Sequence, residues 1–194
     1  ITSLVIPDSV TNIGSSAFKD VSTLTDLTIG SSVTRIEQQA FASTGLTSLN
    51  IPDNVTHLDN FAFANTPLET LYIGTGLISV GLSVFDKSCS ALMSIVINSP
   101  ATLSRNGGTQ SHSVSWREES FRPYSGMHFN EADCSNLETL TFGDNITSIG
   151  DNVFTELTGL TELNLGAAIT GIGNSNFANS KLTSLVIPDS VTNI

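Results

Sequence analysis

The sequence predicts a repeat solenoid, a single stack of short coils with a parallel β-sheet along one face. Two observations support this fold class. The pattern L-x-x-L-x-I recurs at intervals of 22–24 residues, apart from one interval of 45 residues. Residues 1–13 (ITSLVIPDSVTNI) and residues 182–194 (LTSLVIPDSVTNI) differ at a single position. With this period, the 194 residues correspond to eight or nine coils of one solenoid rather than to separate globular domains.

Each coil opens with an expected strand. Positions four to six of the repeat are apolar, variable and apolar, with frequent β-branched residues, which is typical of a strand with one buried face. The expected strands cover residues 4–6, 27–29, 49–51, 71–73, 95–97, 140–142, 163–165 and 185–187. Strands that recur once per coil stack in parallel about 4.8 Å apart.

The rest of the coil consists of corners and an aromatic position that recurs from coil to coil. Pro or Gly follows seven of the expected strands and should start a turn there. A second corner is expected at Gly14, Gly81, Gly150 and Gly173. The eighteenth position holds Phe18, Phe41, Phe63, Phe85, Phe154 and Phe177. We expect a 3₁₀ turn, a short helical turn or a second short strand around this Phe column, which packs in the core.

Composition excludes several classes of partner. The chain has 7 Lys and Arg against 18 Asp and Glu, a formal net charge of −11. This balance argues against nucleic acid or an anionic membrane surface as partner. No apolar run approaches the roughly 18 residues that span a bilayer, so direct membrane insertion is not expected.

The unit L-T-S-L-x-I-P-D-S-V-T-x-I-G-x-x-A-F, as in residues 1–18, resembles the BspA-like class of leucine-rich repeats. The resemblance implies a leucine-rich-repeat solenoid with short strands, 3₁₀ or helical turns opposite its sheet. It also implies an extracellular or cell-surface protein that acts in adhesion, without catalytic residues or cofactors. The sequence starts and stops on the same half-coil, so residues 1–194 are interpreted as part of a longer array, with neighbouring repeats as partners.

The 45-residue interval has two interpretations. Residues 98–136 are either a degenerate, cryptic coil or an insert looped out from a single coil. Threading the pattern through this segment puts Val114 and Trp116 in strand positions and Phe129 in the Phe column. We favour the cryptic coil on this basis.

The same irregular segment is a candidate site. It holds three of the seven basic residues and the only Trp, and irregular segments often carry function. The candidate residues are Arg105, Trp116, Arg117 and Arg122. The alternative is that Trp116 simply fills a core position.

Two cysteines distinguish the interpretations. Cys89 and Cys134 both precede the next coil's first Leu by three residues. If residues 98–136 are looped out, the two cysteines lie on adjacent coils and a disulfide can form. If they form a cryptic coil, the separation is about 9–10 Å, beyond the roughly 7 Å Cα limit for a bridge. On the favoured interpretation the disulfide is not expected.

Catalytic and metal-binding patterns are weak, and we expect neither an enzyme nor a cofactor. His112, His128 and the nearby carboxylates lack zinc-ligand or EF-hand spacing. Asn54-Val55-Thr56 and Asn145-Ile146-Thr147 are glycosylation sequons, relevant only to a secreted eukaryotic chain. The repeat's own consensus explains both sequons.

The outward positions of the expected sheet form the second candidate surface, since side chains alternate between faces of a strand. This surface is rich in hydroxyl groups, mildly acidic and has one aromatic residue. Its candidate residues are Asp26, Thr28, Asn50, Tyr72, Thr141, Glu162 and Asn164. Solvated residues selected for β-propensity are the alternative interpretation.

Three functions are therefore considered. The leading hypothesis is a non-catalytic module that binds a protein or glycan. The second is a structural spacer or head-to-tail filament unit, since neither end shows a polar cap. The third is ice binding by a Thr-rich sheet face, which Val, Asn, Asp, Glu and Tyr interrupt.

Overall fold

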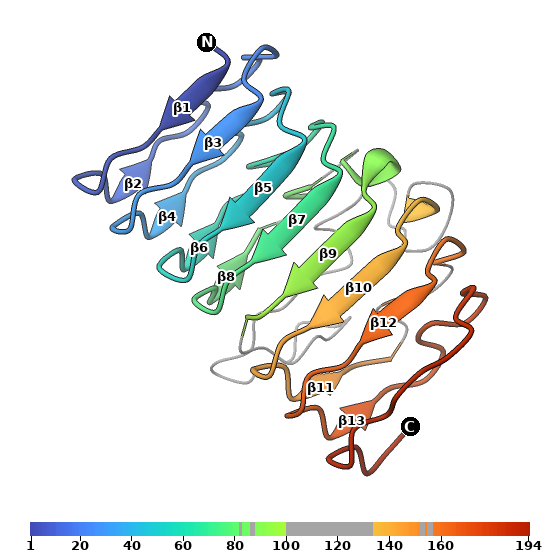
Figure 1. The fold of residues 1–194 in the computed structure, drawn as a ribbon. Coiled ribbons are helices and arrows are strands. Elements are labelled where there is room, and N and C mark those ends of the chain that lie inside the picture. The colour runs from blue at the N-terminus through green and yellow to red at the C-terminus, as the bar shows by residue number, and fades with distance from the viewer. Residues whose placement is uncertain (82, 86–87, 100–133, 152–153, 155–156) are drawn as a thin grey trace.

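The computed structural model describes residues 1–81, 83–85, 88–99, 134–151, 154 and 157–194. Figure 1 shows a single stack of coils, with the N-terminus at one end and the C-terminus at the other. Each regular coil contributes one strand to a front row and a shorter strand to a back row. The solenoid and its parallel sheet, as predicted from the repeat, are confirmed.

The front row contains the strands that open each coil. They are β1 (Ser3–Val5), β3 (Asp26–Thr28), β5 (Ser48–Ile51), β7 (Thr70–Ile73), β9 (Ser94–Ile97), β10 (Thr139–Phe142) and β12 (Glu162–Asn164). β1 pairs with β3, and β5, β7, β9, β10 and β12 form a five-stranded sheet in that order. Every pair is parallel and joins equivalent repeat positions, such as Leu49 with Leu71 and Leu71 with Ile95.

The back row contains two-residue strands at the twelfth and thirteenth repeat positions. They are β2 (Asn12–Ile13), β4 (Arg35–Ile36), β6 (His57–Leu58), β8 (Ser79–Val80), β11 (Ser148–Ile149) and β13 (Gly171–Ile172). β2, β4, β6 and β8 form one sheet and β11 pairs with β13. The second strand of each coil therefore precedes the Phe column. Of the three alternatives expected around that column, the residues there form turns rather than a strand.

The residues around the Phe column form turns that are tied together from coil to coil. The amides of Phe18, Phe41 and Phe63 donate to the carbonyls of Ala40, Ala62 and Val84 at 2.8–2.9 Å. Residues two positions before each Phe are left-handed in several coils, including Gln39 and Phe61 with φ of 56° and 60°. Non-glycine residues rarely adopt this conformation, and the inter-coil hydrogen bonds hold it here.

The core lies between the two rows and repeats with the coils. The rings of Phe18, Phe41, Phe63 and Phe85 stack with centroids 5.3, 5.3 and 6.0 Å apart. Leu24, Leu46 and other first-position residues are completely buried. The apolar columns identified in the sequence are thus the core of the solenoid.

The number of coils is smaller than predicted. Among the described residues, six turns carry both a front and a back strand, rather than the eight or nine coils expected. In the final repeat, residues 182–194, the structure assigns no strand and only a bridge between Gly171 and Asn193. The coil that starts at Leu92 leads into the residues outside the described ranges.

The pairing across the irregular segment contradicts one expectation. A cryptic coil would place a strand with Val114 and Trp116 between β9 and β10. β9 instead pairs directly with β10, with Ser94 opposite Thr139 and Ile97 opposite Phe142. The chain therefore leaves the front sheet after β9 and returns to the next position in it, as the looped-out alternative requires. Residues 100–133 themselves lie outside the described part of the chain.

Candidate functional site

The front sheet presents a continuous row of side chains to solvent. In β5 and β7, the first and third residues are exposed and the second and fourth are buried. Parallel pairing at equivalent positions aligns the outward residues across five strands. The row runs Asn50, Tyr72, Val96, Thr141 and Asn164. Four of the seven sheet residues predicted from the sequence therefore lie in one row.

The remaining predicted sheet residues lie nearby on the same surface. Asp26 and Thr28 are exposed on β3, opposite Ser3 and Val5 of β1. Glu162 is exposed on β12. The sequence located these positions because strand alternation and a constant period determine which side chains point outward.

Hydrogen bonds within and between neighbouring front strands hold several side chains of this surface in place. Ser3 Oγ donates to Asp26 Oδ2 at 2.9 Å, and Thr70 Oγ1 donates to Ser48 Oγ at the same distance. Asn164 Nδ2 donates to Glu162 Oε1 at 2.8 Å and to Thr141 Oγ1 at 3.3 Å. These contacts reduce the side-chain entropy that a ligand would otherwise have to remove on binding.

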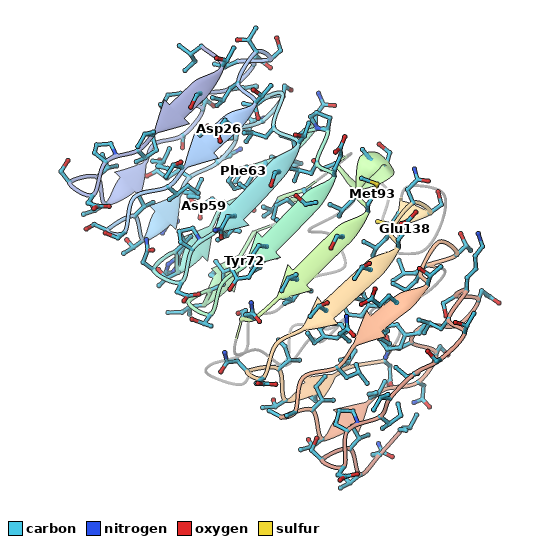
Figure 2. All side chains as sticks on the ribbon, viewed as in Figure 1. Asp26, Asp59, Phe63, Tyr72, Met93 and Glu138 are labelled. Carbon is cyan, nitrogen blue, oxygen red and sulfur yellow. The ribbon has the colours of Figure 1, made fainter. Side chains whose placement is uncertain are left out.

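Like Val5 on β1, Tyr72 and Met93 are exposed on this mostly polar surface. Tyr72 is 40% exposed near its centre, and Met93 is 42% exposed just before β9 (Figure 2). Sequence reasoning identified Tyr72 but missed Met93. The signal was available, because the second repeat position otherwise holds Thr or Glu in every coil.

The carboxyl groups with lowered pKa values lie away from the front sheet. The Ser31 amide and hydroxyl hold the pKa of Asp8 below its ordinary value at the first corner. Hydrogen bonds from Asn12 and from Ser15 lower the pKa of Glu37. Both carboxylates cap backbone amides or side chains of a neighbouring coil, which is a structural role.

The candidate residues of the irregular segment are not placed by the structure. Arg105, Trp116, Arg117 and Arg122 all lie outside the described residues. Their role remains the prediction made from the sequence.

A disulfide joins the turns at the base of this segment. Cys134 is buried and disulfide-bonded. Cys89 is the only other cysteine of the chain and begins the 3₁₀ helix η1 (Cys89–Ala91). Asn136 Nδ2 donates to the Ser90 carbonyl at 2.7 Å, so the two turns are adjacent. The expectation of no disulfide was wrong because it rested on an intervening coil.

The two sequons differ in their surroundings. Asn54 is half-buried, and its Nδ2 donates to the carbonyls of Gly30 and Val33 at 3.2 and 2.6 Å. Asn145 occupies the equivalent repeat position but is exposed. The Asn54 side chain therefore has a structural role that links two coils.

The described residues lack two further functional features. They contain no group of three or more His, Cys, Asp or Glu side chains arranged to hold a metal ion. No helix within the described ranges is long and apolar enough to cross a membrane.

Stacked coils of 22–24 residues with parallel front strands define a leucine-rich-repeat solenoid. The chain belongs to the family described as BspA type leucine rich repeat region, which matches residues 1–107 and 123–194 in six copies. A comparison with curated proteins gives no match.

Solved structures of bacterial leucine-rich repeat proteins share the fold. One from Bacteroides ovatus has a TM-score of 0.60 at 22% identity, with 99% of this chain and 44% of that chain covered. One from Eubacterium ventriosum has a TM-score of 0.56 at 17% identity, with coverages of 98% and 56%. T. pallidum leucine rich repeat protein has a TM-score of 0.59 at 20% identity, with coverages of 89% and 72%. This chain thus spans about half the length of the first two.

Proposed function

We propose that the outward face of the front sheet is the ligand-binding surface of a non-catalytic, secreted or cell-surface repeat protein, and that its ligand is a protein or a glycan. The observation that carries this proposal is the aligned row from Asn50 to Asn164, with exposed Tyr72 near its centre. Tyr is favoured at binding surfaces because it offers a large contact area at low entropic cost.

Two further observations support the proposal. Leucine-rich-repeat and other solenoids present extended surfaces to partners, and the chain belongs to a family of such repeats. The disulfide at Cys134 favours an oxidising location, because disulfides persist in secreted and surface proteins and are rare in the cytosol.

The proposal is tested by measuring binding of the wild-type chain to an array of purified matrix proteins, surface glycoproteins and glycans. Tyr72→Ala should weaken binding of any ligand about tenfold or more, because central aromatic residues dominate interface energetics. Ile78→Ala, which truncates an exposed apolar side chain outside the front strands, is the matched control and should change affinity less than twofold.

Trp116→Ala is the second arm of this experiment. If Trp116→Ala abolishes binding while Tyr72→Ala leaves it unchanged, the ligand contacts the irregular segment and the sheet face is excluded. If no ligand on the array binds, the adhesive function itself is contradicted.

A further inference from the structure

The N-terminal ends of β7, β9 and β10 bring an apolar side chain between two carboxylates. The amide of Met93 donates to the Glu69 carbonyl, and the amide of Glu138 donates to the Met93 carbonyl, both at 2.9 Å. Glu69, Met93 and Glu138 therefore occupy equivalent positions on three consecutive rungs. All three side chains are exposed, and Met93 and Glu138 lie beside each other in Figure 2.

These two carboxylates differ from the other acidic groups of the front face. Asp26 and Glu162 accept hydrogen bonds from Ser3 and Asn164. No such bond or ion pair involves the side chains of Glu69 or Glu138 among the described residues.

No lysine or arginine lies on the described front strands to balance these charges. Arg35, on the back row, is paired with Asp59 at 2.9 Å. Among the described residues, the front face near Met93 is therefore an apolar contact point with a carboxylate on each side and no paired basic side chain, on a chain whose formal net charge is −11.

We propose that Glu69, Met93 and Glu138 select a protein ligand that presents an extended basic segment. The inference rests on the proposed function and specifies its partner. Charge complementarity favours a basic partner, because cationic side chains are attracted to both carboxylates, whereas an acidic or neutral glycan is not.

The spacing of the front strands also limits which residues of the bound segment can carry the basic side chains. Two rung spacings separate Glu69 from Glu138, which is about 10 Å. In an extended peptide, residues i, i+2 and i+4 share one face, and residues i and i+4 are about 13 Å apart, a difference that long Lys, Arg and Glu side chains can span. A segment that crosses the strands can thus direct Lys or Arg at i and i+4 toward the two carboxylates, with an apolar residue at i+2 on Met93.

The test uses the full 194-residue chain and a phage-displayed library of random peptides of about 12 residues. The selected peptides are synthesised, and their affinities are measured for the wild type and for variants. The expected sequences carry Lys or Arg at i and i+4 with an apolar residue at i+2. The double variant Glu69→Gln with Glu138→Gln should weaken their binding about tenfold. Raising the salt concentration from about 50 to about 500 mM should also weaken it.

Asp189→Asn is the matched control, since it removes an exposed carboxylate that lies outside the front strands and the candidate binding residues. Its affinity for the basic peptides should change less than twofold. Met93→Ala should weaken binding without changing its dependence on salt. All these side chains are exposed, so the variants should fold.

The outcomes separate this inference from the proposed function. In one outcome, the selected peptides lack the basic pair, bind the double variant as tightly as the wild type and fail to bind Tyr72→Ala. That result overturns the basic-partner inference and supports the sheet-face function. Basic peptides that are lost in the double variant support the inference. An absence of binders, or binders that ignore every front-face variant, overturns both.

Discussion

The coils before and after the irregular segment share one repeat but pack their aromatic residues differently. Before it, the Phe18, Phe41, Phe63 and Phe85 rings lie nearly parallel, with interplanar angles of 6–13°. After it, Phe154 and Phe177 are still stacked at 10°, but Phe142 meets Phe154 edge-on at 65°.

One substitution in the repeat explains this difference. The sixth position holds Ile in five coils before the segment, and Phe142 in the first coil after it. The larger ring is buried and reaches the Phe column, where an edge-to-face contact is a favourable aromatic geometry. The backbone register of the solenoid therefore tolerates a change in core packing.

Removing a ring from the centre of the regular stack should have the largest effect. Phe63 is completely buried and stacks on two rings, so Phe63→Ala should lower the free energy of unfolding by about 3–5 kcal/mol. Phe177, in the last described turn, is only partly buried, so Phe177→Ala should cost about 1–2 kcal/mol. Urea unfolding measures both, and equal losses would contradict the packing difference between the two regions.

Two glycines compare the backbone packing of the coils before and after the irregular segment. A methyl group on Gly76 would clash with the Asp53 carbonyl of the preceding coil, whereas one on Gly171 meets no atom within 4 Å. Gly76→Ala should therefore destabilise the chain by about 1–3 kcal/mol. Gly171→Ala should stabilise it by about 0.5 kcal/mol, since it restricts the unfolded chain. Thermal unfolding compares them, and a neutral Gly76→Ala would show that the coils are less closely spaced there.

The two sequon asparagines test whether equivalent repeat positions contribute equally to stability. Asn54→Ala removes two hydrogen bonds to backbone carbonyls and should cost about 1–2 kcal/mol. Asn145→Ala alters an exposed side chain and should change stability by less than about 0.5 kcal/mol. Chemical denaturation of the two variants provides the measurement. A larger loss of stability for Asn145→Ala than for Asn54→Ala would contradict the structural role assigned to Asn54.

Acidification should produce the smallest effect, in the first coils. The lowered pKa values of Asp8 and Glu37 mean that their contribution to stability is present above their ordinary values of 3.8 and 4.5. It is lost as the pH falls through the lower values of the folded state. Hydrogen-exchange protection factors, which correct for the intrinsic pH dependence of amide exchange, should therefore fall around Ser15 and Ser31 at about pH 3 relative to about pH 6. Asp8→Asn with Glu37→Gln should remove this dependence, and an unchanged pH profile would contradict it.

Much of the architecture could be predicted because a fixed period constrains it strongly. Leu49, Leu71 and Ile95 were assigned to one column by counting, and the structure pairs them directly. The left-handed turns were not predicted, because their signal in sequence is usually Gly, whereas Gln39 and Phe61 occupy them here. Their geometry comes from hydrogen bonds between coils that a single repeat does not reveal.

The irregular segment shows where the repeat period alone does not predict the fold. The 45-residue interval that contains it equals nearly two periods, and threading the repeat through it suggested a further coil. The register of β9 against β10 excludes a strand between them, and that pairing is non-local information. At the candidate site, alternation located Tyr72, whereas Met93 became significant only when its exposure and flanking carboxylates were known.

The central claim is that the front face binds a ligand around Tyr72. NMR titration of the isotope-labelled chain with the tightest ligand from the array tests it most directly. The account predicts that the amide signals of β5, β7, β9 and β10 shift, with the largest changes at Tyr72 and Val96. Shifts confined to the back strands β4, β6 and β8, with the front row unchanged, would contradict it.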